Sequence, residues 1–373
     1  MIQRTTFALI VLCASLLAGD LCASEKHYRH IMFRESPYAA YRGIHPIDVA
    51  TSQAVQHYEF AYDPAGRLTR VSQKLGDKRI AAHGTWDSFI WFAPEVRIEY
   101  TDNQEVHTYY GLDGAQIEAH GKVWRAVYSL DKQGQRRALA FYDRAGEPVE
   151  SEWQVQRYEW RVAKDGQIFE RRFNLSGELA KLRPELEFYE VKLEYDFDGK
   201  LMFMRNYGLN HELTNNETGA AIDRITYDLA GNFVRWQVYN KEGMPVEGNR
   251  PMVHMGEHLY DAFGNKIGLR GFDRFGNPMT FSWGDFMQRT WYNAHGVRSA
   301  LQVIQADGSI DLHLTYQYTE DLSAQIGVTS IDANGALKND PRLNGAAQVK
   351  FQLNEQGVRV PLFFAADGSP MKR

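Results

Sequence analysis

The chain has 373 residues, of which 44% are hydrophobic and 13% aromatic, including 20 Tyr and 20 Phe. This length allows either two average domains or one array of repeats, and the aromatic content favours strands because aromatic rings pack well on a pleated surface. The formal net charge is −5, and the basic residues form only short patches such as Arg136–Arg137. Nucleic-acid binding is therefore not expected, because it requires a basic stripe.

Residues 1–23 are typical of a secretory signal peptide: a positive charge at Arg4, an apolar run over 7–18 and small residues before the end. The apolar run is too short to span a bilayer, so we expect no transmembrane span in the mature chain. An N-terminal anchor and lipidation at Cys22 stay open, although Asp20 and Leu21 depart from the lipidation pattern. The protein is predicted to be exported to the periplasm, the outer envelope or the extracellular space.

Both cysteines, Cys13 and Cys22, lie in this leader. A mature chain without cysteine has neither a disulfide framework nor a cysteine–zinc site. Residues 24–56 form an N-terminal segment, with a short helix predicted after Pro46 across Ile47 to Gln56. A β-hairpin repeat domain is predicted over 57–373.

A five-residue element recurs along that domain: an aromatic or apolar residue, Asp or Asn, two variable residues and Gly, as in Tyr62-Asp63-Pro64-Ala65-Gly66. Asp or Asn accepts hydrogen bonds from the backbone of a tight turn, and Gly takes a positive φ without a Cβ penalty. Each copy therefore predicts the tip of a β-hairpin. Clear copies begin at Tyr62, Tyr142, Tyr195, Tyr227, Tyr239, Tyr260, Phe272 and Tyr292.

The elements form two interleaved series that each repeat at intervals of about 32 residues. The second series alone adds Gly-x-Pro, as at Pro148 and Pro278, which predicts the end of one strand pairing because proline cannot donate to a ladder. The first series runs through Leu130, Val162, Tyr195, Tyr227, Tyr260 and Tyr292, and the second through Tyr142, Phe173, Tyr239, Phe272 and Ile304.

The segments between turns alternate in polarity, as in Phe233 to Tyr239, so strand periodicity prevails over helix periodicity. The predicted fold is all-β, with tandem antiparallel β-hairpin repeats of about 32 residues forming one elongated or curved sheet. The turn elements resemble the tyrosine-aspartate (YD) repeats of bacterial Rhs-type exported proteins, over roughly Tyr62 to Gly368. That resemblance implies an exported, sheet-forming scaffold and transfers no catalytic residue. The usual repeat of that family is nearer twenty residues, and here an extra segment such as Met279 to Gln288 is inserted.

Two motifs suggest metal binding, and each has a simpler explanation. His254-Met255-Gly256-Glu257-His258 matches a metallopeptidase string. It aligns with strands, however, where residues four apart are about 13 Å from each other, too far to share one zinc ion. Asp196 and Asp198 could share a calcium ion, but turn chemistry accounts for both. We therefore predict no catalytic residue, no metal site and no cofactor.

The eight tryptophans could stack on sugar rings if they lined a groove, although most aromatic residues in sheets are packing partners. They are Trp86, Trp91, Trp124, Trp153, Trp160, Trp236, Trp283 and Trp291.

The leading functional hypothesis is a non-catalytic scaffold that binds a macromolecular partner in the cell envelope, with a protein favoured over a polysaccharide and the polysaccharide left open. The alternatives are a secreted hydrolase whose acidic residues meet only in three dimensions, and an immunity protein against a secreted toxin. A pocket that holds two carboxylates with perturbed titration would favour the hydrolase. An exposed aromatic or apolar strip on a smooth sheet would favour binding.

Overall fold

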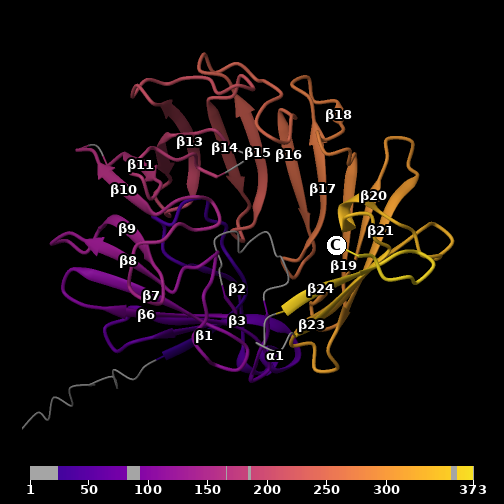
Figure 1. Ribbon diagram of the computed structural model, residues 1–373. Helices are drawn as coiled ribbons and strands as arrows, with labels where there is room; N and C mark the ends of the chain where they lie inside the picture. Colours follow the sequence, from indigo (N-terminus) through magenta and orange to yellow (C-terminus); the bar gives the residue numbers. More distant parts are fainter. Residues whose placement is uncertain (1–23, 82–92, 165, 184–185, 354–358, 373) are drawn as a thin grey trace, which may run out of the picture.

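A computed structural model describes residues 24–81, 93–164, 166–183, 186–353 and 359–372. The described chain is almost entirely β and forms one antiparallel sheet of 24 strands that curls around a concave face (Figure 1). The predicted fold class is confirmed. Among the described residues, no helix is both long and apolar enough to cross a lipid bilayer.

The strands pair almost entirely in chain order, with three departures. Strand β1 lies between β2 and β3, while β5 and β18 are short additions to β4 and β17. The elements are β1 (Ser24–Ile31), β2 (Gly43–Ile47), α1 (Val49–Ala54), β3 (Gln56–Tyr62), β4 (Leu68–Leu75), β5 (Lys78–Arg79), β6 (Glu95–Tyr100), β7 (Gln104–Tyr110), β8 (Arg125–Leu130), β9 (Arg136–Tyr142), β10 (Arg157–Val162), β11 (Ile168–Phe173), β12 (Glu190–Tyr195), β13 (Leu201–Gly208), β14 (Ile222–Tyr227), β15 (Phe233–Tyr239), β16 (Met255–Tyr260), β17 (Lys266–Phe272), β18 (Pro278–Met279), β19 (Met287–Tyr292), β20 (Arg298–Ile304), β21 (Ile310–Tyr318), β22 (Gln325–Ile331), a 3₁₀ turn (Pro341–Leu343), β23 (Gln348–Leu353) and β24 (Arg359–Phe364).

The Asp-to-Gly elements form the hairpin tips, as their chemistry predicts. At the first one, the Gly66 amide donates to the Asp63 carbonyl at 2.9 Å, and the Asp63 carboxylate accepts the Arg67 amide at 2.8 Å. Gly66 has a φ of 79°, in the left-handed region that a side chain disfavours. Pairing is short at the Gly-x-Pro mark but does not always end there. Pro148 makes an isolated bridge to Tyr142, whereas Pro278 begins the two-residue strand β18, which pairs with β17.

The tyrosine that opens a turn element also has a structural role that the motif alone does not reveal. The Tyr260 hydroxyl donates to the Phe233 carbonyl at 2.9 Å, and the Tyr292 hydroxyl donates to the Lys266 carbonyl at 3.0 Å. Each accepting carbonyl lies just past the preceding tip of the first series. Tyrosine therefore ties one repeat to the next, and each such bond contributes about 1 kcal/mol.

Residues 24–56 belong to the same sheet. Helix α1 falls inside the predicted range, and the Asp48 carboxylate caps it by accepting the Thr51 amide at 2.7 Å. Strands β1 and β2 precede it, and β1 pairs with β3. No turn element marks this segment, so its strands are not apparent from the sequence pattern.

Residues 32–42 connect β1 to β2 and pack against part of the concave face. We call this segment the plug. Phe33 is 4% exposed, and its ring centroid lies 4.4 Å from that of Phe233. Tyr38 packs edge-on against Trp160 at 5.5 Å. Figure 1 shows the plug in indigo inside the curve of the sheet. The main hydrophobic core thus lies between the plug and the inner face of β3 to β15.

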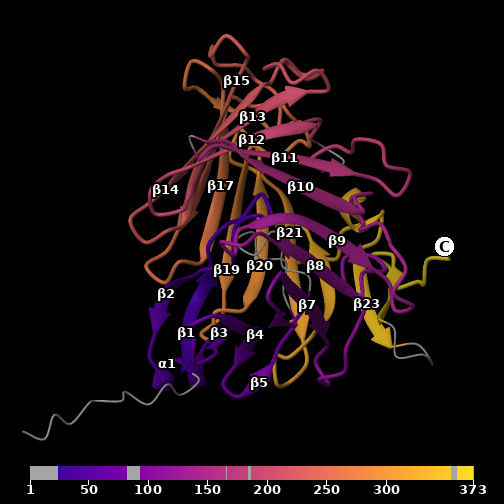
Figure 2. The ribbon, with the colours of Figure 1, turned by 90° about the vertical axis from the view of Figure 1, so that its left-hand side faces the viewer.

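The N-terminal ribbon, which consists of β1, β2 and α1, also runs across the tips of later hairpins. Figure 2 shows β1 and β2 beside the ends of the later strands. The first-series turns all lie at the same end of the strands, so one ribbon can contact several of them. The contacts of the ribbon are His45 to Asn232 (2.8 Å), Arg29 to Asn265 (3.1 Å), His30 to the Phe263 carbonyl (3.1 Å) and the Ala54 carbonyl to His295 (2.8 Å). Arg42, the last residue of the plug, donates to the Asp198 carbonyl (2.6 Å) in the same way.

Candidate functional site

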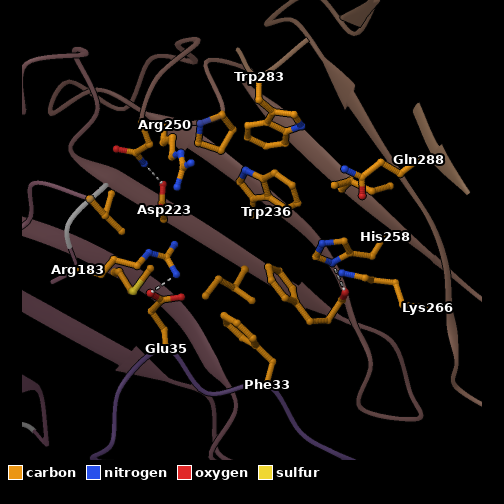
Figure 3. A pocket seen from close by; sticks show the side chains of 17 residues that line it. Phe33, Glu35, Arg183, Asp223, Trp236, Arg250, His258, Lys266, Trp283 and Gln288 are labelled. Carbon is orange, nitrogen blue, oxygen red and sulfur yellow. Dashed lines mark hydrogen bonds and ion pairs between the residues drawn. The ribbon is translucent and has the colours of Figure 1, made fainter. Parts of the chain in front are cut away.

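A cavity of about 330 Å³ opens on the concave face between the plug and strands β14 to β19 (Figure 3). This volume is at the lower end of the range for ligand pockets. Its lining combines aromatic rings with charged and amide groups. The lining residues are Phe33, Glu35, Arg183, Leu186, Met204, Asp223, Ile225, Phe233, Trp236, Asn249, Arg250, Pro251, His258, Lys266, Leu269, Trp283 and Gln288.

The floor of the cavity lies where one inward-facing position of the repeat changes its type of residue. This position lies four residues before the last residue of each strand that leads into a first-series turn. In β8, β10 and β12 it is Ala126, Tyr158 and Val191, all buried in the core. In β14, β16 and β19 the same position holds Asp223, Gly256 and Gln288. Polar and small residues therefore replace the apolar filling at the point where the cavity lies.

The rim comes from the extra segments that lengthen this repeat. Arg183, Arg250 and Trp283 follow the second-series glycines 177, 243 and 276 by similar intervals. All three line the cavity, and Arg250 and Trp283 are exposed at its mouth. The insertion that distinguishes this repeat from a twenty-residue one thus builds the entrance of the site.

Two carboxyl groups lie in the cavity, one from the sheet and one from the plug. The pKa of Asp223 is raised to about 7, first by burial and then by the negative charge of Glu35, while Arg183 and a hydrogen bond from Asn249 oppose the rise. The Asn249 amide donates to Asp223 at 2.8 Å. Glu35 is 5% exposed and pairs with Arg183 at 3.1 Å. Near neutral pH, Asp223 can therefore hold or release a proton while Glu35 is ion-paired.

Replacing Asp223 with asparagine is expected to flatten the pH dependence of stability. The ordinary pKa of aspartate is about 3.9. Between about pH 4 and pH 7 the folded chain therefore binds a proton at Asp223 that the unfolded chain lacks, so the free energy of unfolding falls as pH rises. The wild type should lose roughly 3–4 kcal/mol more than Asp223→Asn between pH 4 and pH 8. Urea unfolding of both proteins across this range measures the difference, and parallel curves would contradict the raised pKa.

His254 and His258 lie on or next to strand β16, which confirms that the segment is not a helix. The Nδ1–H of His254 donates to the Val238 carbonyl and that of His258 to the Phe233 carbonyl, both at 2.8 Å. Burial holds the pKa of His258 well below its usual value, so the ring is neutral. His258 lines the cavity, a position that its place in the metallopeptidase string does not predict. Across the described ranges, no three His, Cys, Asp or Glu residues are grouped so as to hold a metal ion.

An aromatic wall, made of Trp236, Phe281 and Trp283, borders the cavity. A Cβ on Gly256 would overlap the indole of Trp236, so the glycine lets this ring lie across β16. Trp236 stacks on Phe281 with a centroid distance of 6.3 Å, and Phe281 stacks on Trp283 at 4.6 Å and 4°. Trp283 is 39% exposed. Figure 3 shows both indoles at the cavity.

No protein-family model matches this chain, and no curated protein matches it. Among solved structures, "Crystal Structure of TcdB2-TccC3-TEV" is similar over 92% of this chain and 21% of that chain, with 14% identity and a TM-score of 0.24. This chain thus spans about a fifth of the length of that neighbour. A porin-like protein from Bacteroides uniformis is similar over 91% of this chain and 94% of that one, with 12% identity and a TM-score of 0.22. At these values the neighbours say nothing about ligand or activity.

The other residues that the sequence singles out lie apart from the cavity or are not described. Asp196 and Asp198 sit in the turn between β12 and β13, where the Asp196 carboxylate accepts the Lys200 amide at 2.8 Å. Trp160 lies in the core and Trp291 is 41% exposed on β19. Trp124 lies under Arg144, and Trp153 packs against His120. Cys13, Cys22, Trp86 and Trp91 fall outside the described residues.

Proposed function

We propose that the chain is a non-catalytic, exported β-repeat scaffold that binds a macromolecular partner through the cavity on its concave face. The observation that supports this proposal is the composition of the cavity. Aromatic rings at its mouth can bury part of a ligand, while Asp223, Asn249 and Gln288 offer directed hydrogen bonds deeper inside. A curved repeat array also presents a long concave surface around such a site.

The test is a pull-down from envelope extract with the mature protein, alongside a glycan array. Two variants on adjacent residues of β19 control for the site. Gln288→Trp should fill the cavity and abolish capture, whereas Arg289→Trp places the same ring at an exposed residue outside the lining and should retain capture. Equal capture by both variants, with unchanged melting temperatures, would place the binding surface elsewhere.

The Asp223–Glu35 arrangement favours a second candidate, a secreted hydrolase. A carboxyl group with a pKa near 7 can donate a proton, and a nearby ionised carboxylate can act as base or nucleophile. Incubation with a panel of glycan, ester and peptide substrates tests this activity. Cleavage that is lost in both Asp223→Asn and Glu35→Gln would replace the binding proposal with this one.

A further inference from the structure

We infer that the ligand of the cavity is a saccharide, bound as one sugar residue of a longer glycan. This inference rests on the proposed binding function, since it names the ligand class of the same site. It departs from the expectation that the partner is a protein. Three features of the cavity support it: its size, its aromatic wall and its mixture of donors and acceptors.

The cavity is too small to receive the surface of a folded protein. A standard protein interface buries about 800 Å² per partner on a broad and mostly flat patch. A space of about 330 Å³ admits instead one ring or one side chain. Its mouth at Arg250 and Trp283 is exposed, so the rest of a chain-like ligand can continue outward.

The aromatic wall offers flat apolar surfaces suited to the C–H faces of a sugar ring. Trp236 and Trp283 are held through Phe281 in one stacked series, and Gly256 leaves the space that Trp236 occupies. Because neighbouring rings fix both indoles, little side-chain entropy is lost when a ligand stacks on them. Trp283 is also 39% exposed, so a ligand can reach its ring.

The polar groups around this wall are of both hydrogen-bonding kinds, which matches a ligand rich in hydroxyl groups. Asp223 is an acceptor when ionised and a donor when protonated, and its position is set by Asn249 at 2.8 Å. Gln288 is oriented by its bond to Asp285 at 2.7 Å. Arg250 and Lys266 add donors. A hydroxyl is both donor and acceptor, so each of these groups can bond to a sugar.

The experiment uses the mature protein on an array of bacterial envelope polysaccharides and their oligosaccharides, followed by calorimetric titration with the strongest binder. Trp283→Ala is compared with Trp291→Ala, which removes an equally exposed tryptophan, 41% against 39%, outside the cavity lining. Loss of one stacked ring should weaken binding about tenfold, whereas the Trp291 variant should bind like the wild type. Because neither ring is buried, both variants should fold.

Several outcomes would overturn the inference. One is that no glycan binds at millimolar concentration, and another is that both tryptophan variants bind equally well. If no glycan binds while a protein is still captured in a manner blocked by Gln288→Trp, the saccharide assignment fails but the proposed function stands. If the glycan binds and is cleaved, the ligand class holds and the non-catalytic proposal fails.

Discussion

Replacing Arg172 with methionine is expected to lower the free energy of unfolding by about 3–5 kcal/mol, because it leaves a buried carboxylate without its partner. Arg172 and Glu170 are both 0% exposed and pair at 2.6 Å on strand β11. Arg172 also donates to the Tyr189 carbonyl at 2.6 Å. Glu170 accepts the Trp160 indole N–H at 2.7 Å and the hydroxyl of Ser36, which belongs to the plug.

Chemical denaturation monitored by tryptophan fluorescence measures this loss. Arg274→Met is the matched control, because Arg274 pairs with Glu247 while its side chain is 47% exposed, and exposed pairs contribute less than about 1 kcal/mol. The double variant Arg172→Met/Glu170→Gln removes both buried charges and should recover much of the stability. If Arg172→Met is no less stable than Arg274→Met, the buried pair does not stabilise the fold as its burial indicates.

The repeat architecture could be predicted from the sequence because its determinants are local. Asp63 and Gly66 specify a tight turn through their own hydrogen bonds and a positive φ, and the same chemistry recurs at a fixed interval. Turns in a constant phase leave only short segments between them, and these segments can pair with their neighbours alone. The order of the strands within the repeats follows from these facts without long-range information, whereas the position of β1 between β2 and β3 does not.

The plug and the cavity could not be predicted in this way, because they depend on contacts between distant segments. Glu35 lies in a segment with no turn element, and nothing in the sequence indicates that it meets Arg183 and Asp223. One signal for the site does exist in the repeat register. Aligning Asp223, Gly256 and Gln288 with the buried residues of earlier repeats shows where the inner face stops being apolar.

The contact between the N-terminal ribbon and the hairpin tips leads to the second prediction, that Gly264→Ala destabilises the protein more than Gly199→Ala. Both glycines close first-series tips, with φ values of 79° and 76°, so the backbone cost of about 1–2 kcal/mol is shared. A Cβ at 264 would lie 2.5 Å from His45 Nε2 and 2.8 Å from His30 Cδ2, whereas nothing lies within 4 Å of a Cβ at 199. Overpacking should add about 1–3 kcal/mol at 264 alone.

The two histidines cannot move aside without losing other contacts, since His45 bonds to Asn232 and His30 to the Phe263 carbonyl. Gly264→Ala should therefore loosen the ribbon itself, and hydrogen exchange over residues 24–47 should become faster in this variant and not in Gly199→Ala. If the two variants have equal exchange rates and equal free energies of unfolding, the contacts between the ribbon and the tips do not stabilise the protein. The ribbon is continuous with the plug, and the plug supplies Phe33 and Glu35 to the cavity. A loosened ribbon should therefore also weaken ligand binding, which would couple the contact between ribbon and tips to the integrity of the site.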